Sequence, residues 1–233
     1  MKIEGSVALV TGANRGIGNA IALALLENGA AKVYAGARKP ETVTDPRLTA
    51  VKLDVTNPAD IAAVAELAQD VSIVVNNAGL SGGAAQLLGG PLSEAREVME
   101  TNVFGPWEIA RAFAPALTRN GGGALVNVLS VASWWTSGSL PAYSASKAAA
   151  WSLTNALRQG LPETLVVGVH SGFVDTEFSA AITAPKITAE DLAVQVVEAL
   201  RENRIEVLAD RFTRETRAAL SGDVDAVHAI RPY

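Results

Sequence analysis

The sequence predicts an α/β protein, with a central parallel sheet that is doubly wound by helices on both faces. Short apolar runs alternate with helical patterns along the whole chain, as in parallel sheets with crossover helices. Hydrophobic residues make up 49% of the 233 residues and charged residues only 18%, as expected when strands are buried on both faces. No linker, repeat or low-complexity tract interrupts the pattern. We therefore expect a single domain over residues 1–233, with a peripheral tail at 221–233.

Composition argues against several classes of function. The chain has no cysteine, so disulfides and thiolate chemistry are excluded, and its two histidines lie far apart, so we expect no metal site. The net charge of −5 includes no basic run, which argues against nucleic-acid and membrane partners. The start of the chain lacks a signal-peptide pattern, and no apolar run approaches the ~18 residues of a membrane span. A cytoplasmic protein is expected.

The first strand and helix enclose a glycine-rich turn. Residues 7–11 are an apolar run, the segment Gly12-Ala-Asn-Arg-Gly-Ile-Gly18 follows directly, and a helical pattern then continues to Asn28-Gly29. Glycines let the backbone approach a pyrophosphate, and helix N-terminal amides favour its charge. A purely structural tight turn is the alternative. The position between strand and helix favours a dinucleotide site that includes Gly12, Asn14, Arg15, Gly16, Ile17 and Gly18.

The second expected strand, 33–37, bears on the choice of cofactor. An NAD-preferring site places an acidic residue near the end of this strand, but here Ala37 is followed by Arg38. Arg15 stands inside the glycine turn. Two guanidinium groups suit the 2′-phosphate of NADP better than a bare ribose diol. The alternative is that both arginines are solvated surface residues. We expect NADP(H) to be preferred over NAD(H).

Further strands are expected to end at the same edge of the sheet. The third strand, 51–53, ends at Asp54, and Asn57-Pro58 opens a short helix that ends near Gln69. The fourth strand, 71–75, ends in Asn76-Asn77-Ala78-Gly79. The remaining elements are a long or kinked helix at 93–118, strands at 124–129, 165–169 and 206–209, and helices at 142–161, 189–203 and 211–220. Strand ends of this kind face the ligand crevice of an open parallel sheet.

A tyrosine and a lysine are spaced by one helical turn at the start of the 142–161 helix. Tyr143 and Lys147 share a helix face, and an ammonium beside a phenol lowers the phenol's pKa, which suits proton exchange with a carbonyl oxygen. Ser130 ends the 124–129 strand, where its hydroxyl can reach the same oxygen. If Tyr143 and Lys147 are considered without the rest of the chain, the alternative, that they are a chance pair on a surface helix, is favoured over a catalytic pair.

Taken together, these residues resemble the short-chain dehydrogenase/reductase family, from Ser6 to about Ala209. The matching pieces are Thr11-Gly12-Ala-Asn-Arg-Gly16-Ile-Gly18, Asp54-Val55, Asn76-Asn77-Ala78-Gly79, Asn102, Ser130 and Tyr143-Ser-Ala-Ser-Lys147. The resemblance implies a single Rossmann-type domain and an NAD(P)-dependent oxidoreductase that acts on a carbonyl or secondary alcohol.

The resemblance also implies roles for individual residues. Tyr143 would be the general acid/base, and Lys147 would lower its pKa and bind the nicotinamide ribose. Ser130 would polarise the substrate oxygen, and Asn102 would hold a water in the proton relay. The expected cofactor contacts further include Arg38, Asp54 (at the adenine), Val55, Asn76, Ala78, Gly79, Gly172, Val174 and Thr176 (at the carboxamide).

Three departures from the family pattern stand out. Ser171-Gly172 replaces the usual Pro-Gly after the sixth strand, which leaves the stiffness of this loop in question. Few residues separate Thr176 from Lys186, so we expect a small lid and an open pocket. The third helix is also short.

Aromatic residues suggest the substrate. Trp134 and Trp135 lie between Ser130 and Tyr143, where they would form an apolar wall together with Leu80, Phe173 and Phe178. The alternative is that the tryptophans only pack. No basic residue stands out near this pocket, which favours a neutral ketone or aldehyde. His170 is interpreted as structural.

The sequence therefore predicts an NADPH-dependent carbonyl reductase or secondary alcohol dehydrogenase. The alternative is a dinucleotide-binding sensor or scaffold without chemistry, which need not keep Ser130, Tyr143 and Lys147. Beyond the small-molecule substrate, the family resemblance suggests a homodimer or homotetramer that pairs through the helices at 93–118 and 142–161.

Overall fold

The computed structural model describes residues 1–82, 87–89, 91–136 and 138–232, and its core is a seven-stranded parallel sheet. The strand order is β3-β2-β1-β4-β5-β6-β7, so the winding direction reverses between β1 and β4. The strands are β1 (Val7–Thr11), β2 (Lys32–Ala37), β3 (Thr49–Lys52), β4 (Ile73–Asn76), β5 (Ala124–Val128), β6 (Leu165–His170) and β7 (Glu206–Leu208). The doubly wound parallel sheet predicted from the sequence is confirmed.

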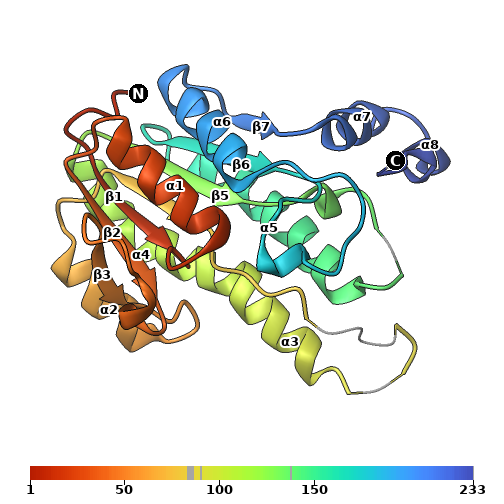
Figure 1. The fold of residues 1–233 in the computed structure, drawn as a ribbon, viewed down its shortest axis with the longest axis horizontal. Helices are drawn as coiled ribbons and strands as arrows, with labels where there is room; N and C mark the ends of the chain where they lie inside the picture. Colours follow the sequence, from red (N-terminus) through yellow and green to blue (C-terminus); the bar gives the residue numbers. More distant parts are fainter. Residues whose placement is uncertain (83–86, 90, 137, 233) are drawn as a thin grey trace.

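Helices cover both faces of the sheet (Figure 1). On one face, α1 (Gly16–Glu27) packs beside α6 (Ala189–Arg201). The other face is covered by α2 (Pro58–Leu67), α4 (Gly105–Arg119) and α5 (Pro141–Gly160). The helix α3 (Ser93–Met99) leads into α4, while α7 (Arg211–Ala219) and α8 (Val224–Ala229) lie at one end of the molecule, beyond β7 (Figure 1).

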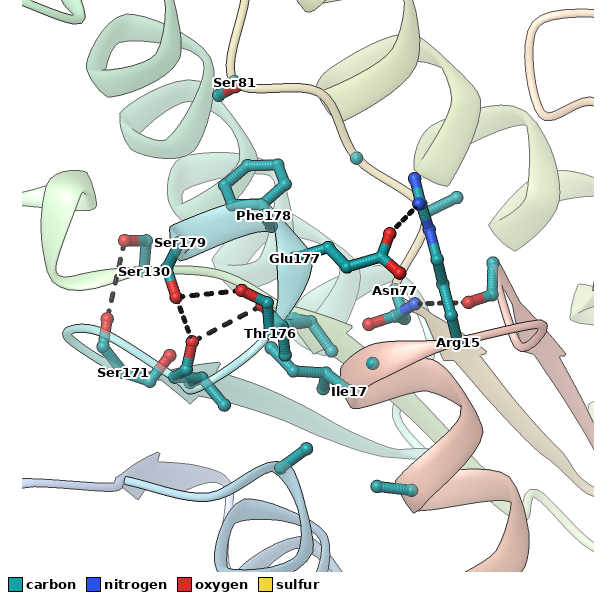
Figure 2. Close-up of a pocket in the computed structure, with 18 of the residues that line it drawn as sticks. Arg15, Ile17, Asn77, Ser81, Ser130, Ser171, Thr176, Glu177, Phe178 and Ser179 are labelled. Atoms are coloured by element: carbon teal, nitrogen blue, oxygen red, sulfur yellow. Dashed lines mark hydrogen bonds and ion pairs between the residues drawn. The ribbon is translucent and has the colours of Figure 1, made fainter. Parts of the chain in front are cut away.

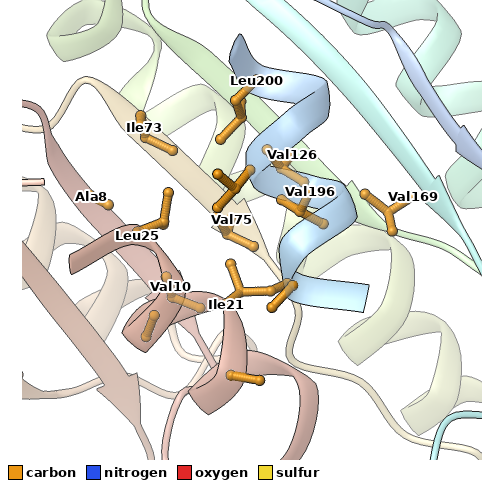
Figure 3. Packing of buried hydrophobic residues seen from close by; sticks show 14 of the residues in the cluster. Ala8, Val10, Ile21, Leu25, Ile73, Val75, Val126, Val169, Val196 and Leu200 are labelled. Carbon is orange, nitrogen blue, oxygen red and sulfur yellow. The ribbon is translucent and has the colours of Figure 1, made fainter. Parts of the chain in front are cut away.

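The core on the α1–α6 face is built from branched aliphatic side chains (Figure 3). Val10 and Val75 of the sheet meet Ile21 of α1 and Val196 of α6, and all four side chains are fully buried. Branched side chains fit a pleated surface well. Burial of one such side chain contributes about 1.5–3 kcal/mol, so this layer holds α1, and the turn before it, firmly against the sheet.

The expected 93–118 helix consists of three pieces. A π-helical turn, Glu100–Phe104, joins α3 to α4. Gly105 follows, and a Cβ there would lie 3.0 Å from the carbonyl oxygen of Val55. The helix therefore approaches the loop after β3 as closely as a glycine permits. Asn57 caps α2 as predicted, because its Oδ1 accepts from the Ala59 amide at 3.0 Å.

The expected peripheral tail contains one short helix. The segment after 221 forms α8, Val227 on that helix is buried, and Asp223 caps it by accepting from the Ala226 amide at 2.8 Å. Among the described residues, no helix is long and apolar enough to cross a membrane.

Candidate active site

A cleft of about 1150 Å³ runs along the carboxyl ends of the strands, where the winding direction reverses. It is lined by the glycine turn after β1, the loops after β2 to β6, the start of α5 and part of α7. Of the predicted site residues, the following line it: Gly12, Asn14, Arg15, Gly16, Ile17, Arg38, Asp54, Val55, Ala78, Gly79, Ser130, Trp135, Tyr143, Lys147, Gly172, Phe173, Val174 and Thr176.

The turn between β1 and α1 is shaped to receive an anion. Gly12 and Gly16 have left-handed φ angles of 65° and 55°, which favour glycine. Arg15, at the N-cap position of α1, makes no side-chain cap, and the first turn of the helix carries no acidic residue. The first amides of α1 therefore remain available to a phosphate, so these residues fit the diphosphate of a dinucleotide.

Gly18 does not line the cleft but lies against the Gly12 backbone and the Asn77 side chain. A Cβ at Gly18 would lie 2.3 Å from the Gly12 carbonyl oxygen and 2.4 Å from the side-chain nitrogen of Asn77. The expectation of a direct cofactor contact at Gly18 is therefore corrected to a packing role, since only a glycine leaves room for the Asn77 amide.

Thr11 and Asn77 tie the glycine turn to the loop after β4. Thr11 Oγ1 accepts from the amides of Asn77 and Ala78, both at 3.0 Å. Asn77 Nδ2 donates to the carbonyls of Thr11 at 2.9 Å and Gly12 at 3.1 Å. Asn77 belongs to the segment Asn76 to Gly79 that was expected to support the cofactor crevice, whereas no role was predicted for Thr11.

Asn76 is a correction to the predicted cofactor contacts. Its Nδ2 donates to Asn127 Oδ1 at 2.9 Å and to the Pro106 carbonyl at 3.3 Å, and the residue is buried away from the cleft. Adjacent residues of a strand point to opposite faces, and Asn76 faces α4. Its neighbour Asn77 occupies the cleft side instead.

The end of the cleft nearest β2 and β3 is formed by Arg38 and Asp54. Asp54 Oδ1 accepts from the Thr56 amide at 2.9 Å and from its hydroxyl at 2.7 Å. Burial raises the pKa of Asp54, but these hydrogen bonds and the charge of Arg38 outweigh it and hold the pKa below its usual value. Arg38 itself is exposed, so it can meet a ligand.

Arg15 forms an ion pair across the cleft with Glu177, on the loop after β6 (Figure 2). The neighbouring Thr176 lies directly over the glycine turn, because a Cβ on Gly16 would meet Thr176 Cγ2 at 3.4 Å. The loop after β6 and the turn after β1 thus face each other over the helix N-terminus. A carboxylate holds one of the two guanidiniums predicted to bind a 2′-phosphate.

Ser130 is held where β5 ends. Its Oγ accepts from the Ala132 amide at 3.1 Å, and its carbonyl lies 3.1 Å from His170 Nδ1. Because a carbonyl only accepts, this contact requires the Nδ1–H tautomer of His170. The Ser171 carbonyl accepts from the Val131 amide at 2.8 Å. The backbone on both sides of the Ser130 hydroxyl is therefore anchored.

Tyr143 and Lys147 share a face of α5, as predicted. Burial raises the pKa of the Tyr143 phenol, and the hydrogen bond with the Ser130 hydroxyl opposes this shift. Burial also lowers the pKa of Lys147 to about 8. Lys147 Nζ donates to the Val128 carbonyl at 2.8 Å and lies 5.7 Å from the centre of the Tyr143 ring. The expected lowering of the tyrosine pKa by Lys147 is therefore wrong for the chain by itself, since burial dominates.

Asn102 does not line the cleft. It lies in the π-helical turn, where Oδ1 accepts from the Leu80 amide at 2.8 Å. Its Nδ2 donates to the Leu80 carbonyl at 2.8 Å and to Ser146 Oγ at 2.9 Å. Both amide hydrogens are thus used within the protein. The side chain therefore joins the loop after β4 to α5, and that Asn102 holds a relay water stays a prediction.

The two tryptophans separate into different environments. Trp134 stacks on His170 with ring centres 3.9 Å apart and meets Trp151 edge-on at 5.9 Å. Trp134 therefore packs behind the cleft, and its predicted place in the apolar wall is corrected. Trp135 lines the cleft and packs edge-on against Phe212 of α7 at 5.5 Å. The apolar wall beside Tyr143 is completed by Leu140, Phe173, Phe178 and Ile182.

Comparison with known proteins agrees with this geometry. The family model for short chain dehydrogenases matches residues 6–187. A solved short chain dehydrogenase from Burkholderia cenocepacia J2315, in complex with NADP, superimposes with a TM-score of 0.93 at 42% identity, covering 98% of each chain. A second, from Burkholderia phymatum and in complex with NAD, has a TM-score of 0.85 at 26% identity, covering 99% of this chain and 98% of that one.

Curated proteins also include relatives of this chain. The 1-deoxy-11-beta-hydroxypentalenate dehydrogenase of Streptomyces arenae is 35% identical over 231 residues, covering 88% of this chain and 82% of the relative. An uncharacterized oxidoreductase of Staphylococcus aureus (strain USA300) is 31% identical over 216 residues, covering 84% of this chain and 91% of the relative.

The fold and the cleft define a doubly wound α/β oxidoreductase that acts on the CH–OH/C=O pair. The chain belongs to the short-chain dehydrogenase family. No cluster of three or more histidine, aspartate or glutamate residues that could hold a metal ion occurs within the described parts of the chain.

The buried His170 predicts a pH-dependent stability. Burial lowers its pKa from 6.5 to about 3, so between these values the unfolded chain binds a proton that the folded chain does not. The free energy of unfolding should therefore rise with pH across this window, by at most about 1.4 kcal/mol per pH unit. Urea denaturation of the parent and His170→Gln between pH 4 and 7.5 measures the difference. His228→Gln, at the exposed histidine, is the control. Equal pH slopes for all three proteins would contradict this assignment.

Proposed function

We propose that this protein is an NADPH-dependent carbonyl reductase or secondary alcohol dehydrogenase, with cofactor and substrate sites in one domain over residues 1–233. The observation that carries the proposal is that the Ser130 hydroxyl and the Tyr143 phenol line the same cleft, with the Lys147 ammonium 5.7 Å from the centre of the Tyr143 ring. Oxidation of NADPH in the presence of neutral ketones and aldehydes tests it. Binding of NADPH without turnover of any carbonyl would favour a dinucleotide-binding sensor or scaffold.

NADPH, when bound, would supply the hydride, and the chain's own residues would manage the proton. As the substrate carbonyl is reduced, negative charge develops on its oxygen. Ser130 would donate a hydrogen bond to that oxygen, and Tyr143 would transfer its proton to it. A raised pKa keeps the Tyr143 phenol protonated at neutral pH, as an acid must be. Lys147, with a pKa of about 8, is mostly charged there and favours the phenolate left behind.

The preference for NADPH is supported by Arg15 and Arg38, which both line the cleft, and by the NADP described in the 42% identical structure. We infer that the ribose phosphate would lie between these guanidiniums. The Asp54 carboxylate already accepts from the Thr56 amide and hydroxyl, and we assign it an adenine contact instead of a ribose-diol contact.

The proposed substrate is a neutral, largely apolar ketone or aldehyde. Besides Arg15 and Arg38, Lys147 is the one lysine or arginine among the described residues that line the cleft, and its ammonium is used at the site. No further cation would hold a phosphate or carboxylate of the substrate. Trp135 and its aromatic neighbours offer an apolar surface instead.

We also propose a homodimer or homotetramer that pairs through α4 and α5. Phe104 and Trp107, at the start of α4, are each 45% exposed. Large apolar side chains grouped on one surface favour association.

The general acid assignment predicts a specific kinetic defect. Tyr143→Phe removes the proton donor and keeps the ring, so kcat should fall by roughly 10²-fold or more while NADPH binding stays nearly intact. Tyr34→Phe is a matched control, because its hydroxyl bonds Lys32 and Asp70 far from the cleft. Steady-state kinetics and NADPH fluorescence titration provide both quantities. Near-normal turnover by Tyr143→Phe would sink the assignment.

The two arginines predict a cofactor preference. NADPH should bind at least about tenfold more tightly than NADH, which corresponds to about 1.4 kcal/mol. Arg38→Asp should erode or reverse this ratio, since it removes a phosphate partner and adds a charge that repels phosphate. Equal affinities of the unmutated protein for the two cofactors would contradict the prediction.

The ion pair of Arg15 predicts that one substitution tightens binding. Glu177 competes with a phosphate for Arg15, so Glu177→Gln should lower the Kd for NADPH by about twofold to fivefold, the scale of an exposed ion pair. Asp175→Asn removes the same charge from the same loop but leaves Arg15 paired, because Asp175 pairs with Lys186. If both variants change the Kd equally, net charge alone explains the effect.

The tryptophans predict contrasting phenotypes. Trp135→Ala should change the relative rates for bulky and small ketones, because it removes part of the cleft wall. Trp134→Ala should instead lower the stability by about 3 kcal/mol and leave the order of substrates unchanged. A substrate panel and denaturation of both variants separate these effects. A flat substrate profile for Trp135→Ala would mean that this residue only packs.

A further inference from the structure

The segment that ends β7 and begins α7 lies directly against the loop after β6. Parallel pairing sets His170 opposite Leu208, which places Gly172 opposite Asp210, two residues beyond each strand. There the Gly172 amide donates to Asp210 Oδ2 at 2.6 Å. A backbone amide bound to a carboxylate is a strong, charge-assisted hydrogen bond.

The loop held in this way lacks its usual stiffening. Ser171 stands where the family pattern has proline, so its φ is not restricted by a ring. Gly172 adds further backbone freedom. A few residues later, Val174 and Thr176 line the cleft, and Thr176 lies against Gly16 of the phosphate turn. Displacement of Gly172 would therefore move the residues expected at the nicotinamide.

The Asp210 carboxylate is itself well fixed. Its Oδ1 accepts from the Thr213 amide at 2.8 Å, capping α7, and its Oδ2 also accepts from the Thr213 hydroxyl at 3.1 Å. A Cβ at Gly172 would lie 3.3 Å from both carboxylate oxygens and from the Phe212 ring, so glycine is what permits this approach.

Helix α7 supports the other wall of the site as well. Phe212 is buried, lines the cleft and contacts the Trp135 ring. Arg217 lies 5.6 Å from the Trp134 ring, on the loop that follows Ser130. The match to the family model ends at residue 187, so Asp210, Phe212 and Arg217 all lie beyond it.

We propose that Asp210 is a positioning residue: by binding the Gly172 amide it holds the loop after β6 in place of the missing proline and so maintains the nicotinamide side of the cleft. The inference rests on the proposed function, because the held loop is assigned to the cofactor. Asp210 does not line the cleft, so it acts through Gly172.

Asp210→Ser tests the proposal without removing the helix cap. Serine caps helices about as well as aspartate, so Thr213 keeps its partner, but the single short hydroxyl leaves the Gly172 amide without an acceptor. Asp223→Ser is the matched control, since Asp223 caps α8 in the same way, through the Ala226 amide, and does not line the cleft. The measurements are hydrogen exchange of the peptide that contains Gly172, thermal stability, and the Kd for NADPH of the full-length proteins.

We expect Asp210→Ser to speed exchange at Gly172 by at least about tenfold and to raise the Kd for NADPH by about fivefold or more. Asp223→Ser should change neither the exchange at Gly172 nor the Kd, although it should change Tm about as much as Asp210→Ser does. Unchanged exchange at Gly172, or faster exchange with an unchanged Kd, overturns the inference.

The titration of the unmutated protein separates this inference from the proposed function. If the parent does not bind NADPH, the proposed function fails, and the cofactor-loop role of Asp210 fails with it. If the parent binds NADPH and Asp210→Ser binds it equally well, the inference alone fails.

Discussion

The site depends on one close approach at the switch point of the sheet. The Asn77 side chain enters beside Gly18 and donates to the carbonyls of Thr11 and Gly12, where any larger residue at position 18 would collide with it. This contact joins the turn after β1 to the loop after β4. It therefore sets where the amides of α1 stand relative to Gly79 and Lys147, which belong to the other half of the cleft.

Burial then determines the protonation behaviour of the catalytic pair. Tyr143 and Lys147 lie where water is largely excluded, so each has its charged form disfavoured: the phenol's pKa rises, and the pKa of the ammonium falls to about 8. The two shifts move the pKa values of the phenol and the ammonium apart, so the phenol stays protonated at neutral pH while the ammonium comes closer to titrating.

Several residues that do not line the cleft hold its parts in place. Asn102 ties Leu80 to Ser146 on α5, His170 holds the Ser130 carbonyl, and Asp210 holds Gly172. Each of these contacts uses a buried or partly buried polar group to fix a backbone that would otherwise be free. In this arrangement the cleft-lining hydroxyls and amides are positioned before any ligand arrives.

The sequence by itself was enough to predict the parallel sheet, the glycine turn between β1 and α1 and the shared helix face of Tyr143 and Lys147, because these rest on local periodicity, glycine spacing and the pitch of one helix. The choice between Asn76 and Asn77, and between Trp134 and Trp135, was made by the tertiary structure. The two members of each pair are adjacent in the chain, and their surroundings decide which one faces the cleft. Asn76 is bound by α4 and Trp134 is stacked on His170, so their neighbours Asn77 and Trp135 face the cleft. Asp210 and Glu177 likewise act across long separations in sequence, so only the folded chain shows that one holds Gly172 and the other Arg15.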